Sequence, residues 1–372
     1  DLVSRTLDMA LDNHNIFASV PALQALGQIA SRNQLYSTNG SSPILQALNY
    51  PNQRVQFAAA ATVLQLDPNR NFDGANRVVQ ILTRALGNSG GPAVLVIDPN
   101  PSRANNMAGM FQQIGYRGQP VIQQTGQAGF RAGVERNDVE LIAVQANVTN
   151  WTLTQTLTNF RADSRTAHLP IVIYGPEFAE ANVQKLLLRF PNTTFVKESV
   201  TLDFFKMQVE PFLAQLEAEP LDEQERAAQA SAAAYWLAHL AAIRRTHLFD
   251  IAPAENALSN AIENPDLVTD ALQALGAIPS KSAQQRLQSV AVSNVYDARV
   301  REQAAIQLAF HIQRHGLLLT GDQTRAVRSA IPAAGDPQLA SALASVMGSL
   351  NPTRQAVGAQ LQQFSLPSPL AQ

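Results

Sequence analysis

Four residues that directly follow short apolar runs in the middle of the sequence are the strongest candidates for chemistry. In chain order they are Asp98, Gln145, Gly175 and Lys197. If the runs are parallel strands, these residues lie together, because ligands of such sheets gather at the carboxyl ends of the strands. Phosphoryl transfer would need an anionic oxygen nucleophile and several oxygen ligands for a cation, but this set contains a single carboxylate. No glycine-rich loop follows the first run, so neither a dinucleotide site nor a P-loop is indicated.

Other constellations carry less chemistry. His311 and His315 are four residues apart, a spacing that suits zinc on one side of a helix. Ile312 stands where a metalloprotease would have glutamate, and no third ligand is evident, so we expect a solvated helix end near Gly316. The chain has no cysteine and no Gly-x-Ser-x-Gly motif. The sequence therefore predicts no catalytic residue, no metal site and no cofactor.

The apolar runs that position the four residues alternate with helical stretches, which predicts βαβ units and a parallel sheet. The expected strands are residues 93–97, 120–122, 139–144, 171–174 and 194–196. The expected helices are residues 102–114, 128–135, 151–160, 177–190 and 201–216. Residues 92–216 are therefore predicted to form one doubly wound α/β domain.

The flanking segments, residues 1–88 and 222–350, read as alanine-rich helices joined by polar turns. One sequence motif recurs in them: a polar turn, often with proline, precedes a helix whose i, i+4 and i+8 positions are apolar or small. The copies begin their apolar stripes at positions 55, 267, 300 and 339. A recurrence of this kind indicates helical hairpins that bury their faces against neighbours.

Two further expectations concern the flanks. In residues 21–29, Leu23, Leu26 and Ile29 form a one-sided apolar stripe, which predicts a helix. Residues 351–372, rich in proline and glutamine, are predicted to be a frayed tail.

The flanking segments resemble HEAT repeats. The resemblance rests on Asp297-Ala298-Arg299-Val300-Arg301 and on Asn52-Gln53-Arg54-Val55, which are similar to the motif that opens the second helix of such a repeat. It implies an all-α, armadillo-like framework with long surfaces for protein partners. A plain helical bundle is the alternative.

Residues 92–216 resemble the receiver domain of response regulators. The most specific marks are Leu169-Pro170-Ile171-Val172 before the fourth strand and Val196-Lys197 at the end of the fifth. The resemblance implies a flavodoxin-like sheet of order 2-1-3-4-5. It also implies a position in the receiver pattern for each of the four candidate residues. Asp98 matches one of the acids that hold the metal, and Gln145 stands at the phosphoacceptor position. Gly175 stands where receivers have a Ser or Thr hydroxyl, and Lys197 matches the lysine at the end of their fifth strand.

The departures from the receiver pattern predict an inert module. Pro99 replaces the second acid, and the neutral amide of Gln145 is a poor nucleophile. We therefore expect a pseudo-receiver that is not phosphorylated. Asp98 and Lys197 are expected to form an ion pair at the sheet edge or, alternatively, to line a ligand-sensing pocket.

These observations predict a non-catalytic scaffold or adaptor for protein partners. By resemblance, the interacting face comprises the fourth helix, fifth strand and fifth helix of the receiver-like domain. Candidate surface residues are Trp151, Glu177, Lys185 and Arg189. A small-molecule sensor that uses the degenerate pocket is the alternative, and a phosphoacceptor that uses Asp98 itself is a third hypothesis.

Charge and hydropathy limit the partners. Lys+Arg number 27 against Asp+Glu 29, and the absence of a basic run argues against nucleic acid. No apolar run approaches the roughly 18 residues of a membrane span. The absence of cysteine fits either a cytoplasmic or an exported protein, with the cytoplasm slightly favoured. Because the sequence begins at Asp1 with a helical pattern, we expect a fragment or a processed form, and a removed signal peptide is compatible with it.

Overall fold

The computed structural model divides the chain into two compact units, Asp1–Trp236 and Leu237–Gln372. It describes residues 2–36, 42–87, 91–136, 138–163, 165–198, 201–216, 221–243 and 245–350. The boundary between the units falls within one helix, α11 (Glu223–Ala242). The tail predicted for residues 351–372 lies outside the described residues.

The first unit begins with helices that pack as hairpins. They are α1 (Leu2–Asp12), α2 (Ile16–Ile29), the short η1 (Arg32–Tyr36), α3 (Pro43–Ala47), α4 (Gln53–Gln65) and α5 (Ala75–Gly87). Helix α1 packs on α2, α3 on α4, and α2 on α4. The side chain of Asn52 caps α4 by accepting hydrogen bonds from two backbone N–H groups, as its residue type favours. The predicted stripe of α4 is buried. In α2, Leu23 and Leu26 are buried, whereas Ile29 at the helix end is 69% exposed.

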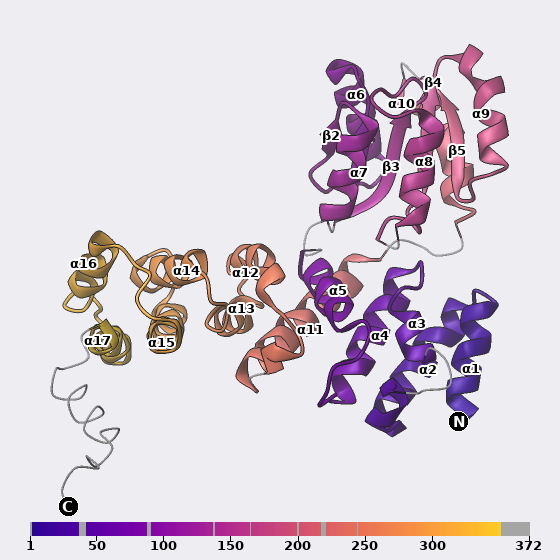
Figure 1. Cartoon of the computed structure of the whole chain (residues 1–372). Helices are drawn as coiled ribbons and strands as arrows, with labels where there is room; N and C mark the ends of the chain where they lie inside the picture. Colours follow the sequence, from indigo (N-terminus) through magenta and orange to yellow (C-terminus); the bar gives the residue numbers. More distant parts are fainter. Residues whose placement is uncertain are drawn as a thin grey trace, which may run out of the picture. The chain divides into compact units, whose positions relative to one another are not determined.

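A five-stranded parallel sheet follows, with the order β2-β1-β3-β4-β5 (Figure 1). The strands are β1 (Ala93–Ile97), β2 (Val121–Gln123), β3 (Val139–Gln145), β4 (Ile171–Gly175) and β5 (Thr193–Lys197). The three central strands are buried along their whole length, which explains their continuous apolar runs. The predicted strand order is therefore confirmed, and this part of the chain has a flavodoxin-like α/β fold.

Helices cover both faces of the sheet. They are α6 (Pro101–Gln113), α7 (Gly126–Glu135), α8 (Leu153–Ala162), η2 (Glu177–Ala179) with α9 (Glu180–Leu187), and α10 (Leu202–Leu213). One core cluster contains side chains of α7, α8 and α9, and the other contains side chains of α6 and α10. Strand β5 forms one edge of the sheet between α9 and α10 and is only half-buried.

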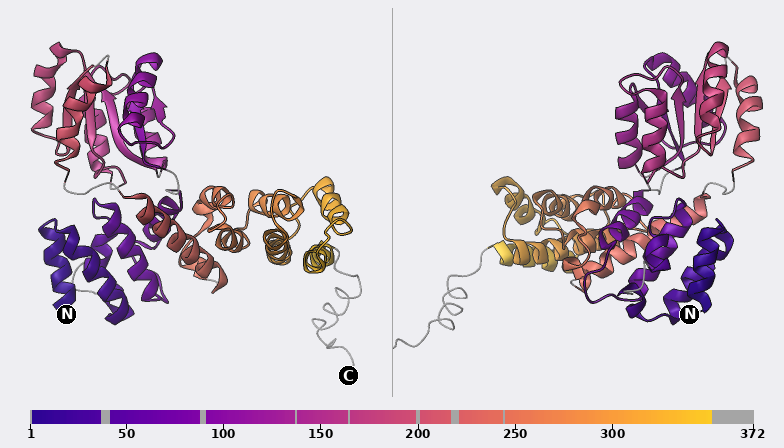
Figure 2. Two further views of the ribbon diagram at one scale, coloured as in Figure 1. Left: turned by 180° about the vertical axis from the view of Figure 1, so that it is seen from behind. Right: turned by 45° about the vertical axis from the view of Figure 1, so that its right-hand side comes forward.

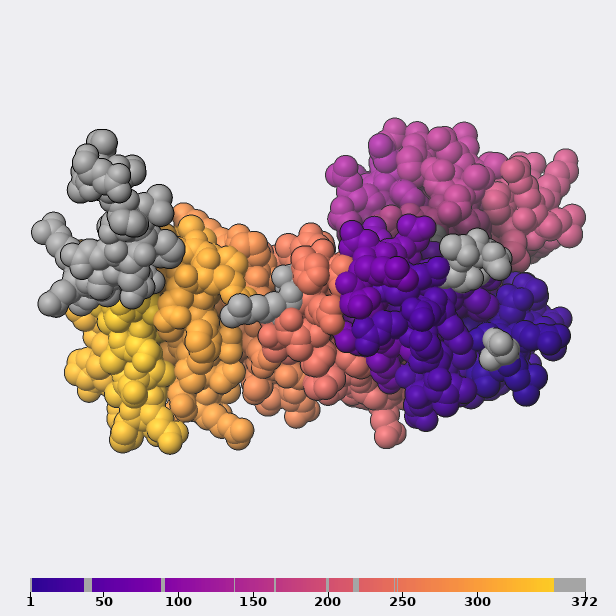
Figure 3. Space-filling model, turned by 60° about the horizontal axis from the view of Figure 1, so that its bottom comes forward, coloured from indigo at the N-terminus to yellow at the C-terminus, as the bar shows by residue number. Residues whose placement is uncertain are grey.

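The second unit is a stack of helical hairpins. After η3 (Arg245–His247) and η4 (Ala252–Ala254) it contains α12 (Glu255–Ala261), α13 (Val268–Leu275), α14 (Lys281–Val292), α15 (Ala298–His315), α16 (Gly321–Ala330) and α17 (Pro337–Leu350). Figure 2 shows these six helices in two rows, α12, α14 and α16 in one and α13, α15 and α17 in the other. In the space-filling view their orange and yellow residues form a closely packed surface (Figure 3). The recurring stripes of α13, α15 and α17 face this packing: Leu275, Ala304, Leu308 and Leu343 are fully buried.

Among the described helices, none combines the length and apolar character that crossing a bilayer requires.

Candidate functional site

The structure brings the four candidate residues to one edge of the sheet. Asp98 directly follows β1, and Gln145, Gly175 and Lys197 are the last residues of β3, β4 and β5. In the register of the sheet, Gly175 lies beside Lys197. Their common location follows from the parallel arrangement, in which all carboxyl ends of the strands meet at the same edge.

Asp98 is the centre of this edge, and both of its carboxylate oxygens are fully engaged. Arg103 donates through Nε to Oδ2 at 2.7 Å and through Nη2 to Oδ1 at 2.8 Å. The hydroxyl of Tyr174 donates to Oδ2 at 2.7 Å, and the backbone N–H of Asn100 donates to Oδ1 at 2.7 Å. The side chain of Asp98 has no exposed surface. Each oxygen therefore accepts two hydrogen bonds, which is the capacity of an ionised carboxylate.

Local structure explains how Arg103 reaches Asp98. Asn100 caps α6 by accepting hydrogen bonds from the N–H groups of Ser102 and Arg103, and Pro101 occupies the first helical position. Arg103 thus lies in the first turn, next to the strand end that carries Asp98. The two parallel N–H···O bonds form a bidentate pair, the strongest geometry for arginine and carboxylate.

The charges of this cluster perturb its neighbours. The hydrogen bond to Asp98 raises the pKa of Arg103. Burial, together with the hydrogen bond to Asp98, strongly raises the pKa of Tyr174, so its hydroxyl remains a proton donor at neutral pH. Glu198 lies 3.6 Å from Nε of Arg103 and adds a second acid to the cluster.

The remaining candidate residues have other partners than expected. The Gln145 amide donates to Glu198 at 3.4 Å, and its carbonyl oxygen accepts a hydrogen bond from the backbone N–H of Asn147. Lys197 pairs with Glu177 at 2.7 Å and with Glu180 at 3.4 Å. The predicted ion pair between Asp98 and Lys197 is therefore wrong.

Arg103 and Tyr174 are the residues that sequence reasoning missed. An arginine five positions after the aspartate, in the first turn of the next helix, was a usable signal for the first. Tyr174 precedes Gly175 in an otherwise aliphatic strand, and its hydroxyl needs a partner when buried. A bound cation would need the carboxylate of Asp98 as a ligand. The guanidinium of Arg103 and the phenol of Tyr174 already occupy that carboxylate.

The candidate surface residues fall on two separate elements. Glu177 in η2, and Lys185 and Arg189 in and after α9, are exposed. Trp151 instead precedes α8 and is half-buried, with its ring 5.9 Å from that of Phe130 in α7. Trp151 therefore belongs to the packing of α7 and α8.

The histidine pair is not a solvated helix end. His311 is fully buried, with hydrogen bonds to Gln284 Nε2 at 2.9 Å and to the carbonyl oxygen of Ile278 at 2.8 Å. His315 is half-buried. Among the described residues, no three His, Asp or Glu side chains come together in a group that could hold a metal ion.

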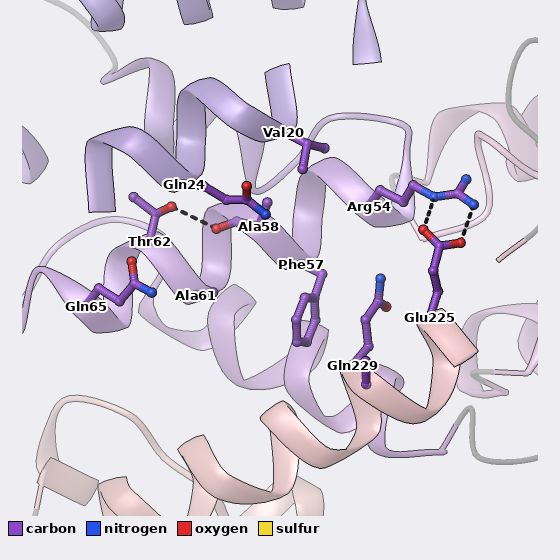
Figure 4. Close-up of a pocket in the computed structure, with 11 residues that line it drawn as sticks. Val20, Gln24, Arg54, Phe57, Ala58, Ala61, Thr62, Gln65, Glu225 and Gln229 are labelled. Carbon is purple, nitrogen blue, oxygen red and sulfur yellow. Dashed lines mark hydrogen bonds and ion pairs between the residues drawn. The ribbon is translucent and has the colours of Figure 1, made fainter. Parts of the chain in front are cut away.

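A groove in the helical part of the first unit is the second candidate site (Figure 4). It has a volume of about 350 Å³ and lies between α2, α4 and the first turns of α11. Its wall is mainly apolar, with Phe57 and Ala61 from α4, and the ion pair between Arg54 and Glu225 (2.6 Å) closes one end. Carboxamides line it from three helices, and they make no side-chain hydrogen bond within the described part of the chain: Gln24, Gln65 and Gln229.

In comparisons with known proteins, no family model, no curated protein and no solved structure matches this chain.

Proposed function

We propose that the chain is a non-catalytic protein-interaction scaffold, in which HEAT-like helical repeats carry a pseudo-receiver. The observation that carries the first half of this proposal is the engagement of Asp98. A carboxylate that already accepts four hydrogen bonds, two of them from a guanidinium, has no lone pair left for a cation or for attack on phosphorus. Gln145 at the neighbouring strand end offers only a neutral amide.

The location of exposed apolar side chains supports the second half. Among the described residues of the α/β fold, the large hydrophobic side chains exposed by 41% or more all lie on or next to the helical elements that flank edge strand β5: Phe178, Leu188, Phe204 and Met207. Leu188, at the end of α9, is 93% exposed. Exposed apolar side chains gathered around an edge strand favour a protein-binding surface. It is the same face that the receiver resemblance implies.

The experiment compares proteins captured by the intact chain and by two variants. The double variant Leu188→Glu with Met207→Glu places charge on both flanking helices without touching the core. Val295→Glu is the matched control, because Val295 is 86% exposed on a different part of the chain. We expect a stoichiometric partner to be retained by the wild type and the control and lost from the double variant. Equal retention by all three would contradict this face as the docking surface.

A second measurement tests the non-catalytic assignment. Incubation with acetyl phosphate and Mg²⁺, followed by intact mass spectrometry, should leave the mass unchanged. A phosphoryl adduct that Asp98→Asn abolishes would overturn the proposal.

The small-molecule sensor is less well supported at the sheet edge, because Asp98 is enclosed and its oxygens are occupied. The groove of Figure 4 has a volume within the range of small-molecule sites. A thermal-shift screen with metabolites and nucleotides separates the two hypotheses. A stabilising ligand whose effect is lost in Gln229→Ala would favour the sensor.

A further inference from the structure

Two arginines of α5 are buried without an acidic partner. Arg77 and Arg84 are 8% and 7% exposed and, seven residues apart, lie on the same side of the helix. A buried charge normally pairs with an opposite charge, because removing it from water is costly. The partners of these two guanidinium groups are therefore informative.

Among the residues that the structure describes, only neutral oxygens accept hydrogen bonds from the two side chains. Arg77 donates to the carbonyl oxygen of Leu48 and to the amide oxygens of Gln56 and Gln80, at 3.2 to 3.3 Å. Arg84 donates through Nη2 to the carbonyl oxygen of Arg165 at 2.6 Å. Its Nε and Nη1 atoms are buried and have no hydrogen-bond partner among the described residues.

The nearby acids are committed to other arginines. Both oxygens of Asp163 accept from Arg165, at 2.9 and 2.7 Å. Glu140 is paired with Arg226 at 2.8 Å. Because both acids are hydrogen-bonded to other arginines, they offset the charges of the two α5 arginines only partly and from a distance.

The buried positive charge cannot be removed by proton loss at neutral pH. Burial, with the nearby charges of Arg77 and Arg165, lowers the pKa of Arg84 to about 10, which still leaves it protonated. Burial, with the nearby charges of Arg84, Arg161 and Arg77, holds the pKa of His168 well below its usual value, so this imidazole is neutral. The interior around Arg84 thus carries net positive charge.

A small cavity adjoins Arg84 where α4, α5 and α11 meet. Its volume is about 10 Å³, and its lining includes Gln53, Phe57, Ile81 and Gln229. The Nε2 atom of Gln53 is also buried without a partner among the described residues. The cavity is large enough for one water-sized particle. The buried unpaired atoms of the residues on its wall, Arg84 Nε, Arg84 Nη1 and Gln53 Nε2, are all hydrogen-bond donors.

We propose that this cavity binds a single monatomic anion, chloride, through Arg84 Nε and Nη1 and Gln53 Nε2. A water molecule would fill the space but would not offset the positive charge, and the small volume favours a monatomic ion over phosphate or sulfate. The bound ion would link α4 and α5 next to their contact with α11. It is independent of the partner-binding face on α9 and α10.

The test uses the full chain in sodium chloride and in sodium gluconate at equal ionic strength. We expect chloride to stabilise the protein in a saturable manner. Above the dissociation constant, each tenfold rise in chloride should shift the folding equilibrium by up to about tenfold. Crystals grown with bromide should show an anomalous peak within hydrogen-bond distance of Arg84. Equal stability in both salts, or a cavity that contains only water, would overturn the proposal.

Variants tie the effect to this cavity. Arg84→Met keeps an unbranched apolar stem but removes the guanidinium and its charge, and should abolish the chloride dependence. Gln53→Leu, a milder change, should weaken chloride binding without abolishing folding, and therefore covers the case in which Arg84→Met does not fold. Arg5→Met, on the exposed side of α1, is the matched control and should respond to chloride like the wild type. A chloride effect that survives in Gln53→Leu unchanged would place the ion elsewhere and refute the site.

Discussion

At the scale of single residues, the ion pair between Asp98 and Arg103 decides what the sheet edge can do. A fully enclosed carboxylate requires a permanent partner, and this chain supplies it from its own helix α6. The positive charge that compensates Asp98 is thus part of the protein itself.

Removal of the guanidinium should therefore destabilise the fold. Arg103→Met leaves Asp98 enclosed and uncompensated, and we expect a loss of about 2 kcal/mol in the free energy of unfolding, because Arg103 itself is partly exposed. Urea denaturation measures the change. Arg131→Met, an exposed position on α7, is the control and should have little effect. A loss no larger than that of the control would show that the pair contributes nothing.

The partner of Asp98 could not be predicted from the sequence, although the strand that precedes it could. Strand β1 could be predicted to the residue, because a continuous apolar run has few other solutions. The cation that reaches Asp98 could not, since Arg103 and Lys197 both lie near the same edge. Strand β5 is three strands away from β1, about 14 Å at the usual spacing, and that distance favours the arginine next to the aspartate. The exposure of Ile29 and the burial of His311 were likewise set by which helices pack against them, which local pattern does not specify.

At the scale of elements, polar caps determine where the helices of the repeat-like segments begin. Asp297 accepts a hydrogen bond from the backbone N–H of Val300 at 2.8 Å and starts α15. Asn52 does the same for α4. The polar residue of the recurring motif is therefore an N-cap that marks the beginning of a helix.

The cap of α15 gives a direct test. Asp297→Ala should lower the free energy of unfolding by about 1 kcal/mol, because an N-terminal N–H group loses its acceptor. Asp297→Asn retains an acceptor and should restore most of the loss. If both variants are equally unstable, the charge of Asp297 matters more than its role as a cap.

A second pair connects strand β3 to helix α11 and predicts a pH dependence. Burial raises the pKa of Glu140, and Arg226 partly opposes the rise. An acid with a raised pKa in the folded state contributes stability below its unfolded pKa, and that contribution is lost as the pH rises through the folded value. Relative to Glu140→Gln, which does not ionise, the wild type should therefore become less stable between about pH 4 and pH 7.

Urea denaturation of both proteins at the two pH values measures this difference. Glu135→Gln, exposed on α7, is the control and should keep a constant offset from the wild type. A constant offset for Glu140→Gln as well would refute the prediction.

At the scale of the whole molecule, the α/β fold is inserted between two helical stretches. It begins after α5 and ends before α11, while Arg54 of α4 pairs directly with Glu225 of α11. Helices on both sides of the insertion therefore touch without it.

Replacement of residues 92–216 by a short Gly-Ser linker should leave these helices folded. Far-UV circular dichroism and limited proteolysis of the shortened chain measure this, and the shortened chain with Arg54→Met is the matched comparison. We expect the pair to hold α4 and α11 together in the first protein and proteolysis to become faster in the second. Rapid degradation of both would show that the helices depend on the α/β fold.

The ion pair between Arg54 and Glu225 joins α4 to α11 directly. The α/β fold lies between these helices in the sequence but is not needed for this contact. An inserted domain of this kind can be lost, exchanged or duplicated while the helices before and after it remain joined by their own ion pair. Evolution and protein engineering can therefore change the inserted α/β fold while the flanking helices are kept.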